Sequence, residues 1–348
     1  MSDSPSVSAK QARSTVRLRG RTGTELPGFV DIQLNGGFGY DFTTNAHSIW
    51  EVGSLLPRLG VTAFVPTLIS APAEVAIAAM KLLRAGPPDG WVGSLPIGIH
   101  LEGPMISPRR RGTHPVELLQ DPTQELVERL IDAGPPLMVT IAPELAGAEE
   151  AIRQLTEMGT IISIGHSDAT STQAEAAVKW GARHATHLFN AMSGLDHRNP
   201  GMASTILTDD RLTTGLISDG VHVASEMLAL AYRMKGSEGI ALVTDAIAAL
   251  GLDDGPHSIG PVDVTVSGIT ARNAEGVLAG SAASMCHVFR TMLTATGCSL
   301  ADASTMASST PSRIVGHQPD QDDLVILDSD LEVAATVIGG QVMYDRDA

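Results

Sequence analysis

Several features that mark other classes of protein are scarce in this chain of 348 residues. The only cysteines are Cys286 and Cys298, so there is no disulfide framework and a reducing, cytoplasmic setting is favoured. Lys and Arg number 23 against 39 Asp and Glu, and the net charge of −16 argues against nucleic acid as a partner. No apolar run reaches the roughly 18 residues of a membrane span, so we expect no membrane association.

The N-terminal segment also lacks the apolar core of a signal peptide. It reads "MSDSPSVSAKQARSTVRLRG", and we expect its first dozen residues to be disordered, with a strand near residues 15–20.

The net negative charge of the protein has a consequence for substrate binding. If the substrate is an anion, a local basic pocket must overcome the field of the whole protein.

Short apolar, β-branched runs recur along the chain, and segments with helical periodicity separate most of them. The runs span residues 28–34, 61–68, 96–101, 137–142, 160–166, 183–188, 215–219 and 240–245. The helical patterns span residues 47–58, 72–85, 117–133, 147–157, 171–181 and 224–234. Apolar strands that alternate with helices indicate a parallel sheet covered on both faces. Eight repeats favour an α/β fold of the (β/α)₈ TIM-barrel type over an open doubly wound sheet.

Polar or ionisable residues stand at the C-terminal ends of most of these runs. They are Gln33, Asn35, Glu102, His166, His187, Asp219 and Asp245. In a barrel these ends meet at one mouth, where active sites are built. We therefore expect these side chains to converge.

The remaining segments predict a small β domain made by both chain ends. We assign residues 27–318 to the barrel, with a turn-rich insertion near residues 252–280, and residues 319–348 to the C-terminal strands of the small domain. Residues 1–26 would supply the disordered start and a partial N-terminal contribution. Because so few residues precede the first barrel strand, this domain should be thin on that side.

Glu102, His166 and His187 lie at or next to the C-terminal ends of three different runs. Two imidazoles and a carboxylate, with one position left open, are the ligand set of a catalytic zinc ion. Such an ion lowers the pKa of a bound water from roughly 15.7 to about 7 and polarises a carbonyl oxygen. Each residue alone would more often be a hydrogen-bonded structural group or a substrate contact. Three of them at barrel-strand ends favour the metal site, although the spacing alone is not diagnostic.

Asp245 and His114 are candidates for proton transfer and for charge stabilisation. A carboxylate at Asp245 could take a proton from a metal-bound water and pass it to a leaving amine, but Asp is also common as a helix N-cap. His114 follows the run Arg109–Arg111 and could reach back over the mouth towards a developing oxyanion. The three arginines themselves are interpreted as a solvated loop.

The segment of residues 189–201 offers groups suited to holding a phosphate. They are Asn190, the backbone amides near Ala191, and Arg198. His222, in "SDGVHV", could join them.

Taken in order, these segments resemble the N-acetylglucosamine-6-phosphate deacetylases of the amidohydrolase superfamily. The matching motifs are "PGFVDIQLNG", "HLEGP", "RGTHP", "APE", "GHSDAT", "THLFNAM", "HRNPG", "SDGVHV", "LVTDA" and "LAGS". They keep the family's order and similar spacing from Pro27 to Ser281, so no single motif carries the likeness. The resemblance implies a barrel with a small β-sandwich domain from both chain ends, and a homodimer.

The resemblance also implies a role for each matching residue. Glu102, His166 and His187 would hold one divalent metal ion per chain, usually zinc. Asp245 matches the general base and acid, and His114 matches a histidine that helps to polarise the substrate carbonyl. The residues that match the sugar-phosphate site are Asn190, Ala191 through its backbone, His222 and, from the neighbouring subunit, Arg198.

The reaction implied is hydrolysis of N-acetylglucosamine 6-phosphate to glucosamine 6-phosphate and acetate. The resemblance implies that metal-activated water would attack the acetyl carbonyl, and that Asp245 would take the proton of the water and deliver it to the departing amine. The phosphate contacts supply remote binding energy that fixes the amide at the metal. Arg198 and His222 would set the local field that lets an acidic protein select an anion.

One pattern of the wider superfamily is missing. Two-metal members typically carry His-x-His on the first strand and often a bridging lysine on the fourth, but these places hold Gln33-Leu34-Asn35 and "VTIAPE". Amides are poor ligands for zinc beside imidazole or carboxylate. We therefore expect Gln33 and Asn35 to line the vacated second-metal position with neutral hydrogen-bonding groups, and no metal at Gln33.

Two alternatives stay open. A deacetylase of an epimeric sugar phosphate, such as N-acetylgalactosamine 6-phosphate, would have the same motifs. A non-catalytic sugar-phosphate-binding protein would be expected to lack a ligand or the base, whereas Glu102, His166, His187 and Asp245 are all present.

Overall fold

A computed structural model describes residues 23–259, 262–273 and 278–348. The expected disordered start and the strand near residues 15–20 lie outside these ranges. Within them, no helix is both long enough and apolar enough to cross a membrane.

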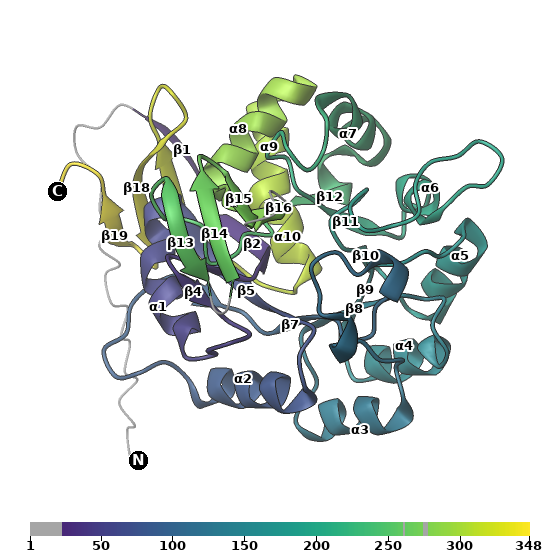
Figure 1. Cartoon of the computed structure of the whole chain (residues 1–348). Coiled ribbons are helices and arrows are strands. Elements are labelled where there is room, and N and C mark those ends of the chain that lie inside the picture. Colours follow the sequence, from purple (N-terminus) through teal and green to yellow (C-terminus); the bar gives the residue numbers. More distant parts are fainter. Residues whose placement is uncertain (1–22, 260–261, 274–277) are drawn as a thin grey trace, which may run out of the picture.

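Eight parallel strands, one from each apolar run, form the barrel (Figure 1). They are β2 (Phe29–Leu34), β5 (Val61–Ile69), β7 (His100–Glu102), β8 (Met138–Ile141), β9 (Ile161–Ile164), β10 (His184–Ala185), β11 (Thr213–Leu216) and β12 (Ile240–Leu242). The sheet order follows the chain from β2 to β12, and β6 (Leu95–Pro96) pairs with β5. A parallel bridge between Leu34 and Ala246 joins the first run to the last. The predicted barrel is confirmed.

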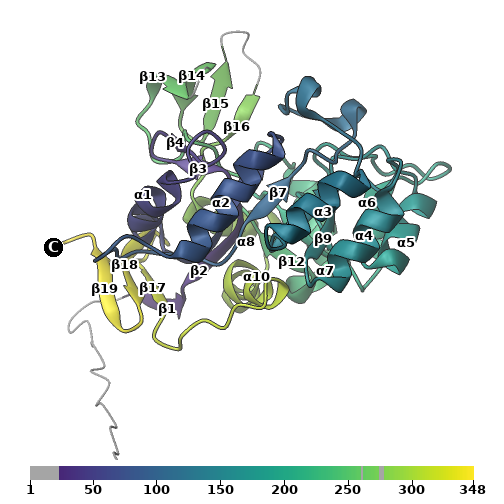
Figure 2. The ribbon, with the colours of Figure 1, turned by 90° about the horizontal axis from the view of Figure 1, so that it is seen from below.

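Helices follow most of the strands and cover the outside of the barrel (Figures 1 and 2). They are α1 (Ser48–Leu55), α2 (Ala73–Ala85), α3 (Gln124–Asp132), α4 (Ala148–Glu157), α5 (Ser171–Trp180), α6 (Met202–Thr208), α7 (Ser225–Gly239), α8 (Met285–Thr296), α9 (Leu300–Ser304) and α10 (Thr310–Ile314). Short turns of 3₁₀ or π-helix add η1 (Leu56–Leu59), η2 (Pro108–Arg110), η3 (Val116–Leu118) and η4 (Thr305–Ser309).

Two helix starts show how local chemistry sets the boundaries. The pattern over residues 117–133 predicts one helix, but α3 begins only at Gln124, because the Thr123 side chain caps it by accepting the Leu126 N–H. Helix α5 begins with a capping box between Thr170 and Gln173.

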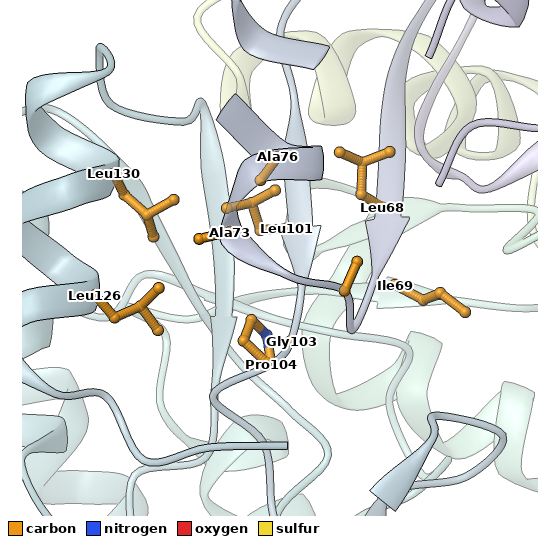
Figure 3. A pocket seen from close by; sticks show the side chains of 10 residues that line it. Leu68, Ile69, Ala73, Ala76, Leu101, Gly103, Pro104, Leu126 and Leu130 are labelled. Carbon is orange, nitrogen blue, oxygen red and sulfur yellow. The ribbon is translucent and has the colours of Figure 1, made fainter. Parts of the chain in front are cut away.

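The helices pack on the barrel through small and branched apolar side chains. Figure 3 shows one such layer, where Ala73 and Ala76 of α2 and Leu126 of α3 face Leu68 and Leu101 of the barrel strands. The space left between them is about 10 Å³. That is too little for more than one water molecule, so this pocket is a packing seam and no ligand site.

One layer of the barrel interior, beneath the strand ends, is polar. His100 Nε2 lies 2.8 Å from Thr140 Oγ1, which lies 2.8 Å from Thr186 Oγ1, and Ser163 Oγ lies 2.6 Å from the same Thr186 oxygen. These buried groups satisfy one another and link four neighbouring strands, β7 to β10. The candidate site residues stand directly above this hydrogen-bonded layer.

Both chain ends contribute to one small antiparallel sheet, as the fold prediction expects. Its strands, in order, are β1 (Thr24–Pro27), β17 (Leu324–Leu327), β18 (Val333–Ile338) and β19 (Gln341–Asp345). The Thr336 hydroxyl donates to the Pro57 carbonyl at 2.6 Å and fastens this sheet to the barrel.

The insertion near residues 252–280 is more regular than its turn-rich sequence indicates. It forms a second antiparallel sheet of β13 (Gly255–Ile259), β14 (Val262–Ser267), β15 (Thr270–Asn273) and β16 (Leu278–Ser281). Figure 2 shows this sheet beside the small hairpin of β3 (Gly36–Gly37) and β4 (Tyr40–Asp41), away from the chain-end sheet. It therefore stands on the side of the barrel where β2 ends.

Candidate metal and catalytic site

Glu102, His166 and His187 meet at the mouth of the barrel. Glu102 is the last residue of β7, and the two histidines each follow a strand by two residues. Glu102 Oε1 lies 3.0 Å from His166 Nε2 and 2.9 Å from His187 Nε2, and the two Nε2 atoms are 3.0 Å apart. All three side chains are buried. The sequence prediction that these residues converge is confirmed.

The backbone at these strand ends is strained. His166, His187 and Asp245 have φ angles of +47°, +25° and +47°. Left-handed conformations in residues other than glycine cost on the order of 1–3 kcal/mol each and cluster at functional sites. The strands therefore turn abruptly where the candidate side chains enter the mouth.

The hydrogen bonds of His166 show that the cluster fits a cation. His166 Nδ1 lies 2.8 Å from the Arg110 carbonyl, which can only accept, so Nδ1 carries the proton. In the neutral ring, Nε2 then presents a lone pair to Glu102 Oε1 and to His187 Nε2. Lone pairs that converge in this way require a shared proton or a metal ion between them.

The electrostatics of the cluster agree with that reading. Burial opposes a charge on His187, yet the hydrogen bond and charge of Glu102 raise the pKa of His187 to about 9. Burial likewise opposes the ionisation of Glu102, but its contacts with the two histidines hold its pKa well below the ordinary value. The site thus stabilises positive charge. Within the described ranges, this is the one group of three such side chains that could hold a metal ion.

Gln33 and Asn35 lie beside this cluster, on the side of Asp245. Gln33 Nε2 donates to Glu102 Oε1 at 3.0 Å and to Asp245 Oδ1 at 3.1 Å, and Asn35 Nδ2 donates to the same Asp245 oxygen at 2.8 Å. The two amides are buried and link the candidate base to a candidate ligand. Both side chains are neutral donors of hydrogen bonds.

Asp245 is held in place by these donors and by the backbone. Its N–H donates to the Gln33 carbonyl at 2.9 Å. Burial and the charge of Glu102 raise the pKa of Asp245 to about 6. No helix begins after Asp245 within described residues 246–259, so the alternative of a helix N-cap is wrong.

His114 reaches the cluster from the loop after β7. Its ring meets the His166 ring edge-on, with the centroids 4.7 Å apart. Its Nδ1 accepts from the Ser70 backbone N–H at 3.2 Å, so the proton of the neutral ring stands on Nε2. Burial lowers the pKa of His114 to about 3, and the ring is neutral at pH 7. His114 is thus a hydrogen-bond donor.

The candidate phosphate ligands are arranged less tightly. Within the described part of the chain, the Ala191 N–H has no hydrogen-bond acceptor, and Asn190 Nδ2 makes only long contacts of 3.4 Å. His222 Nδ1 pairs with Asp219 Oδ2 at 2.6 Å, which orients the ring. These residues follow β10 and β11, at the same end of the barrel as the cluster.

Arg198 stands apart from the others. It lies in the exposed loop of residues 194–200, which projects from the barrel before α6 (Figure 1). In the described chain, its guanidinium contacts none of the other candidate residues. A single chain therefore does not bring Arg198 into the site.

Several site residues were not identified from the sequence. Asp168 and Glu144 lie in the motifs "GHSDAT" and "APE", and Ser70 follows the second run, but their partners come from distant segments that spacing does not reveal. The Arg110 side chain is 40% exposed, which agrees with a solvated loop, but its guanidinium also pairs with Asp168 at 2.8 Å. The sequence gives one signal for the Arg110–Asp168 contact, which is that both segments are expected at the same mouth of the barrel.

Comparison with known proteins agrees with the fold. The model of the amidohydrolase family matches residues 25–343. The chain therefore belongs to the amidohydrolase family, and it is a hydrolase.

Within that family, the chain groups with the N-acetylglucosamine-6-phosphate deacetylases. The human protein of that name is 41% identical over 347 residues, covering 92% of this chain and 84% of the human one. A Mycobacterium smegmatis enzyme, solved as an aspartate-to-alanine variant in complex with N-acetyl-D-glucosamine-6-phosphate, is 37% identical with a TM-score of 0.84, covering 92% of this chain and 87% of that chain. An N-acetylgalactosamine-6-phosphate deacetylase of Escherichia coli O157:H7 is 35% identical, covering 91% of this chain and 86% of the relative.

Proposed function

We propose that this chain hydrolyses N-acetylglucosamine 6-phosphate to glucosamine 6-phosphate and acetate. The observation that carries the proposal is the convergence of Glu102, His166 and His187 beside Asp245. The names of the human and mycobacterial relatives support the choice of substrate.

Glu102, His166 and His187 would hold one divalent metal ion per chain, and zinc suits two imidazoles and a carboxylate. When bound, such an ion lowers the pKa of a water molecule to about 7 and polarises a carbonyl oxygen. Gln33 and Asn35 supply hydrogen bonds instead of ligands, and we propose that they keep a second metal out.

Asp245 would act as the general base and then as the general acid. With its pKa near 6, the carboxylate is largely ionised at neutral pH and accepts a proton from the attacking water. Because Gln33 and Asn35 hold Oδ1, the other oxygen is left to carry this proton to the departing amine nitrogen. Breaking the C–N bond then releases the amine and acetate.

His114 would stabilise the oxyanion that develops on the acetyl carbonyl. Ser70 fixes its tautomer, so Nε2–H is a donor. A preorganised donor of this kind contributes on the order of 10²–10³-fold to kcat.

Asn190, the Ala191 N–H and His222 would hold the phosphate of the substrate. Arg198, exposed and unpaired within the described chain, would reach the phosphate bound by the neighbouring subunit of a homodimer. Residues of both subunits would thereby bind the phosphate, and this binding would fix the amide of the substrate over the metal site.

Acetate release tests this proposal. The purified enzyme is incubated with N-acetylglucosamine 6-phosphate and, separately, with the galactosamine epimer. We expect a clearly higher kcat/KM for the glucosamine derivative. A preference for the galactosamine derivative would favour the alternative that the E. coli relative suggests, and no release from either would favour a non-catalytic binding protein.

A further inference from the structure

The three arginines after Glu102 have no part in the proposed reaction, yet two of them contact the loop after β9. Arg110 places both Nε and Nη2 on Asp168 Oδ1, at 2.9 and 2.8 Å, whereas Arg109 makes one contact of 3.4 Å with Asp168 Oδ2. The Arg109 side chain is 83% exposed and that of Arg110 is 40% exposed. The two neighbours thus differ in how firmly they bind the same aspartate.

The Arg110–Asp168 pair joins the two segments that carry Glu102 and His166. Asp168 follows His166 by two residues, and the Arg110 carbonyl accepts the His166 Nδ1–H at 2.8 Å. Asp168 therefore holds the side chain of Arg110, and the backbone carbonyl of Arg110 in turn holds the imidazole of His166. This carbonyl determines which nitrogen of His166 faces Glu102.

The Asp168 end of the pair is itself held firmly. Glu144, after β8, accepts the Asp168 N–H at 2.7 Å and the Ser167 hydroxyl at 2.6 Å. His166 needs such support because its φ of +47° is unfavourable for a residue other than glycine. Without fixed neighbours, the backbone would relax to a conformation of lower free energy, and His166 would turn away from the cluster.

We propose that the Arg110–Asp168 pair is a positioning device that sets the metal affinity of the site, by keeping the Arg110 carbonyl on His166 Nδ1. This inference rests on the proposed role of His166 as a metal ligand. Groups that orient a ligating histidine typically change metal affinity by about 10–100-fold when they are lost. An isolated surface ion pair would change only stability, and that slightly.

The charge of Arg110 makes the test decisive. Removing a cation beside a metal site strengthens metal binding if only the local field matters. Losing the positioning device weakens metal binding instead. The two explanations therefore predict opposite signs for Arg110→Met.

The experiment measures the zinc Kd of the metal-free full chain by competition with a chelator. The matched pair is Arg110→Met and Arg109→Met, which remove the same charge from the same loop. We expect Arg110→Met to raise the Kd about 10–100-fold and Arg109→Met to leave it near the wild-type value. An Arg110→Met Kd equal to or below that of Arg109→Met would overturn the inference.

A second variant guards against simple misfolding. Asp168→Asn should also weaken zinc binding, and the double variant Arg110→Met/Asp168→Asn should be no weaker than the worse single variant, because both act through one contact. Additive losses would contradict a shared device. His166→Asn separates this inference from the proposed function: if it binds zinc as tightly as wild type, the metal role of His166 fails, whatever the pair does.

Discussion

Asp245 shows how one strand end can be prepared for proton transfer. Two amides donate to one of its oxygens, a backbone bond fixes its N–H, and burial lifts its pKa towards neutrality. A group whose pKa lies near the working pH can both take and return a proton. In the proposed mechanism, the neutral donors at Gln33 and Asn35 therefore belong to the acid–base apparatus.

The first prediction concerns this residue. Asp245→Asn keeps the size of the side chain but removes the base, so we expect kcat to fall by about 10²–10⁴-fold. Zinc content should stay at the wild-type value, because Asp245 is not a proposed ligand. Steady-state acetate release and metal analysis of the same preparation would check both points. A kcat close to that of the wild type would refute the assignment.

Asp31 yields a second prediction at this scale. Burial raises the pKa of Asp31 from 3.8 to about 7, although hydrogen bonds from Thr244 and Gln33 act to lower it. Between those two pH values the native state holds a proton that the unfolded state has lost, so the stability contributed by Asp31 falls as the pH rises and is lost above about 7. The slope is roughly 1.4 kcal/mol per pH unit.

Urea unfolding at several pH values between 5 and 8 tests this, with Asp31→Asn as the comparison. The free energy of unfolding of the wild type minus that of the variant should decrease with pH up to about 7 and then level off. A difference that does not change with pH would mean that Asp31 is ionised throughout.

At the residue scale, the sequence predicts that the main candidate residues converge, but it does not predict the contacts that hold them in place. Glu102, His166, His187 and Asp245 each end an apolar run, so the barrel pattern alone gathers them. Asp168, Glu144 and Ser70 act through contacts between loops that are distant in the chain. Such contacts follow from tertiary geometry, which spacing does not encode.

At the scale of elements, the strands β9 and β10 must lie close for His166 and His187 to meet. Gly165 makes this possible: a Cβ there would lie 2.6 Å from Thr186 Cβ and 3.1 Å from Thr140 Cγ2. Both neighbours belong to the buried hydroxyl layer and cannot move freely.

We therefore expect Gly165→Ala to lower the free energy of unfolding by roughly 1–3 kcal/mol and to weaken zinc binding, since it forces the two strand ends apart. Gly194→Ala is the matched control, because no atom lies within 4 Å of its added Cβ. Urea unfolding and zinc titration of both variants would check this. Equal stability of the two would show that the strand spacing tolerates a methyl group.

The elements themselves were predicted unevenly. The sequence predicts all eight strand runs, most of which are nearly continuous apolar segments. The run of residues 183–188 is mostly polar, and its strand β10 has only two residues, His184–Ala185. The glycines and prolines of the insertion predict turns, and the sequence does not predict that its short strands pair into one sheet. Helix α3 starts late because the Thr123 cap outweighs the periodicity before it.

At the scale of the whole molecule, the exposed Arg198 leads to a prediction about assembly. If it serves the neighbouring site, Arg198→Ala and Asp245→Asn homodimers are each impaired. After subunit exchange, a mixed dimer has one site with both residues intact. Equal mixing should therefore restore about a quarter of wild-type acetate release. No recovery, with exchange verified, would show that Arg198 does not act across subunits.

The account as a whole rests on a single metal ion held by Glu102, His166 and His187. The most direct test adds zinc stepwise to the metal-free protein and follows acetate release from N-acetylglucosamine 6-phosphate. We predict that the activity rises linearly and saturates at about one zinc ion per chain. Saturation at about two ions per chain, or full activity in the metal-free protein, would contradict the account.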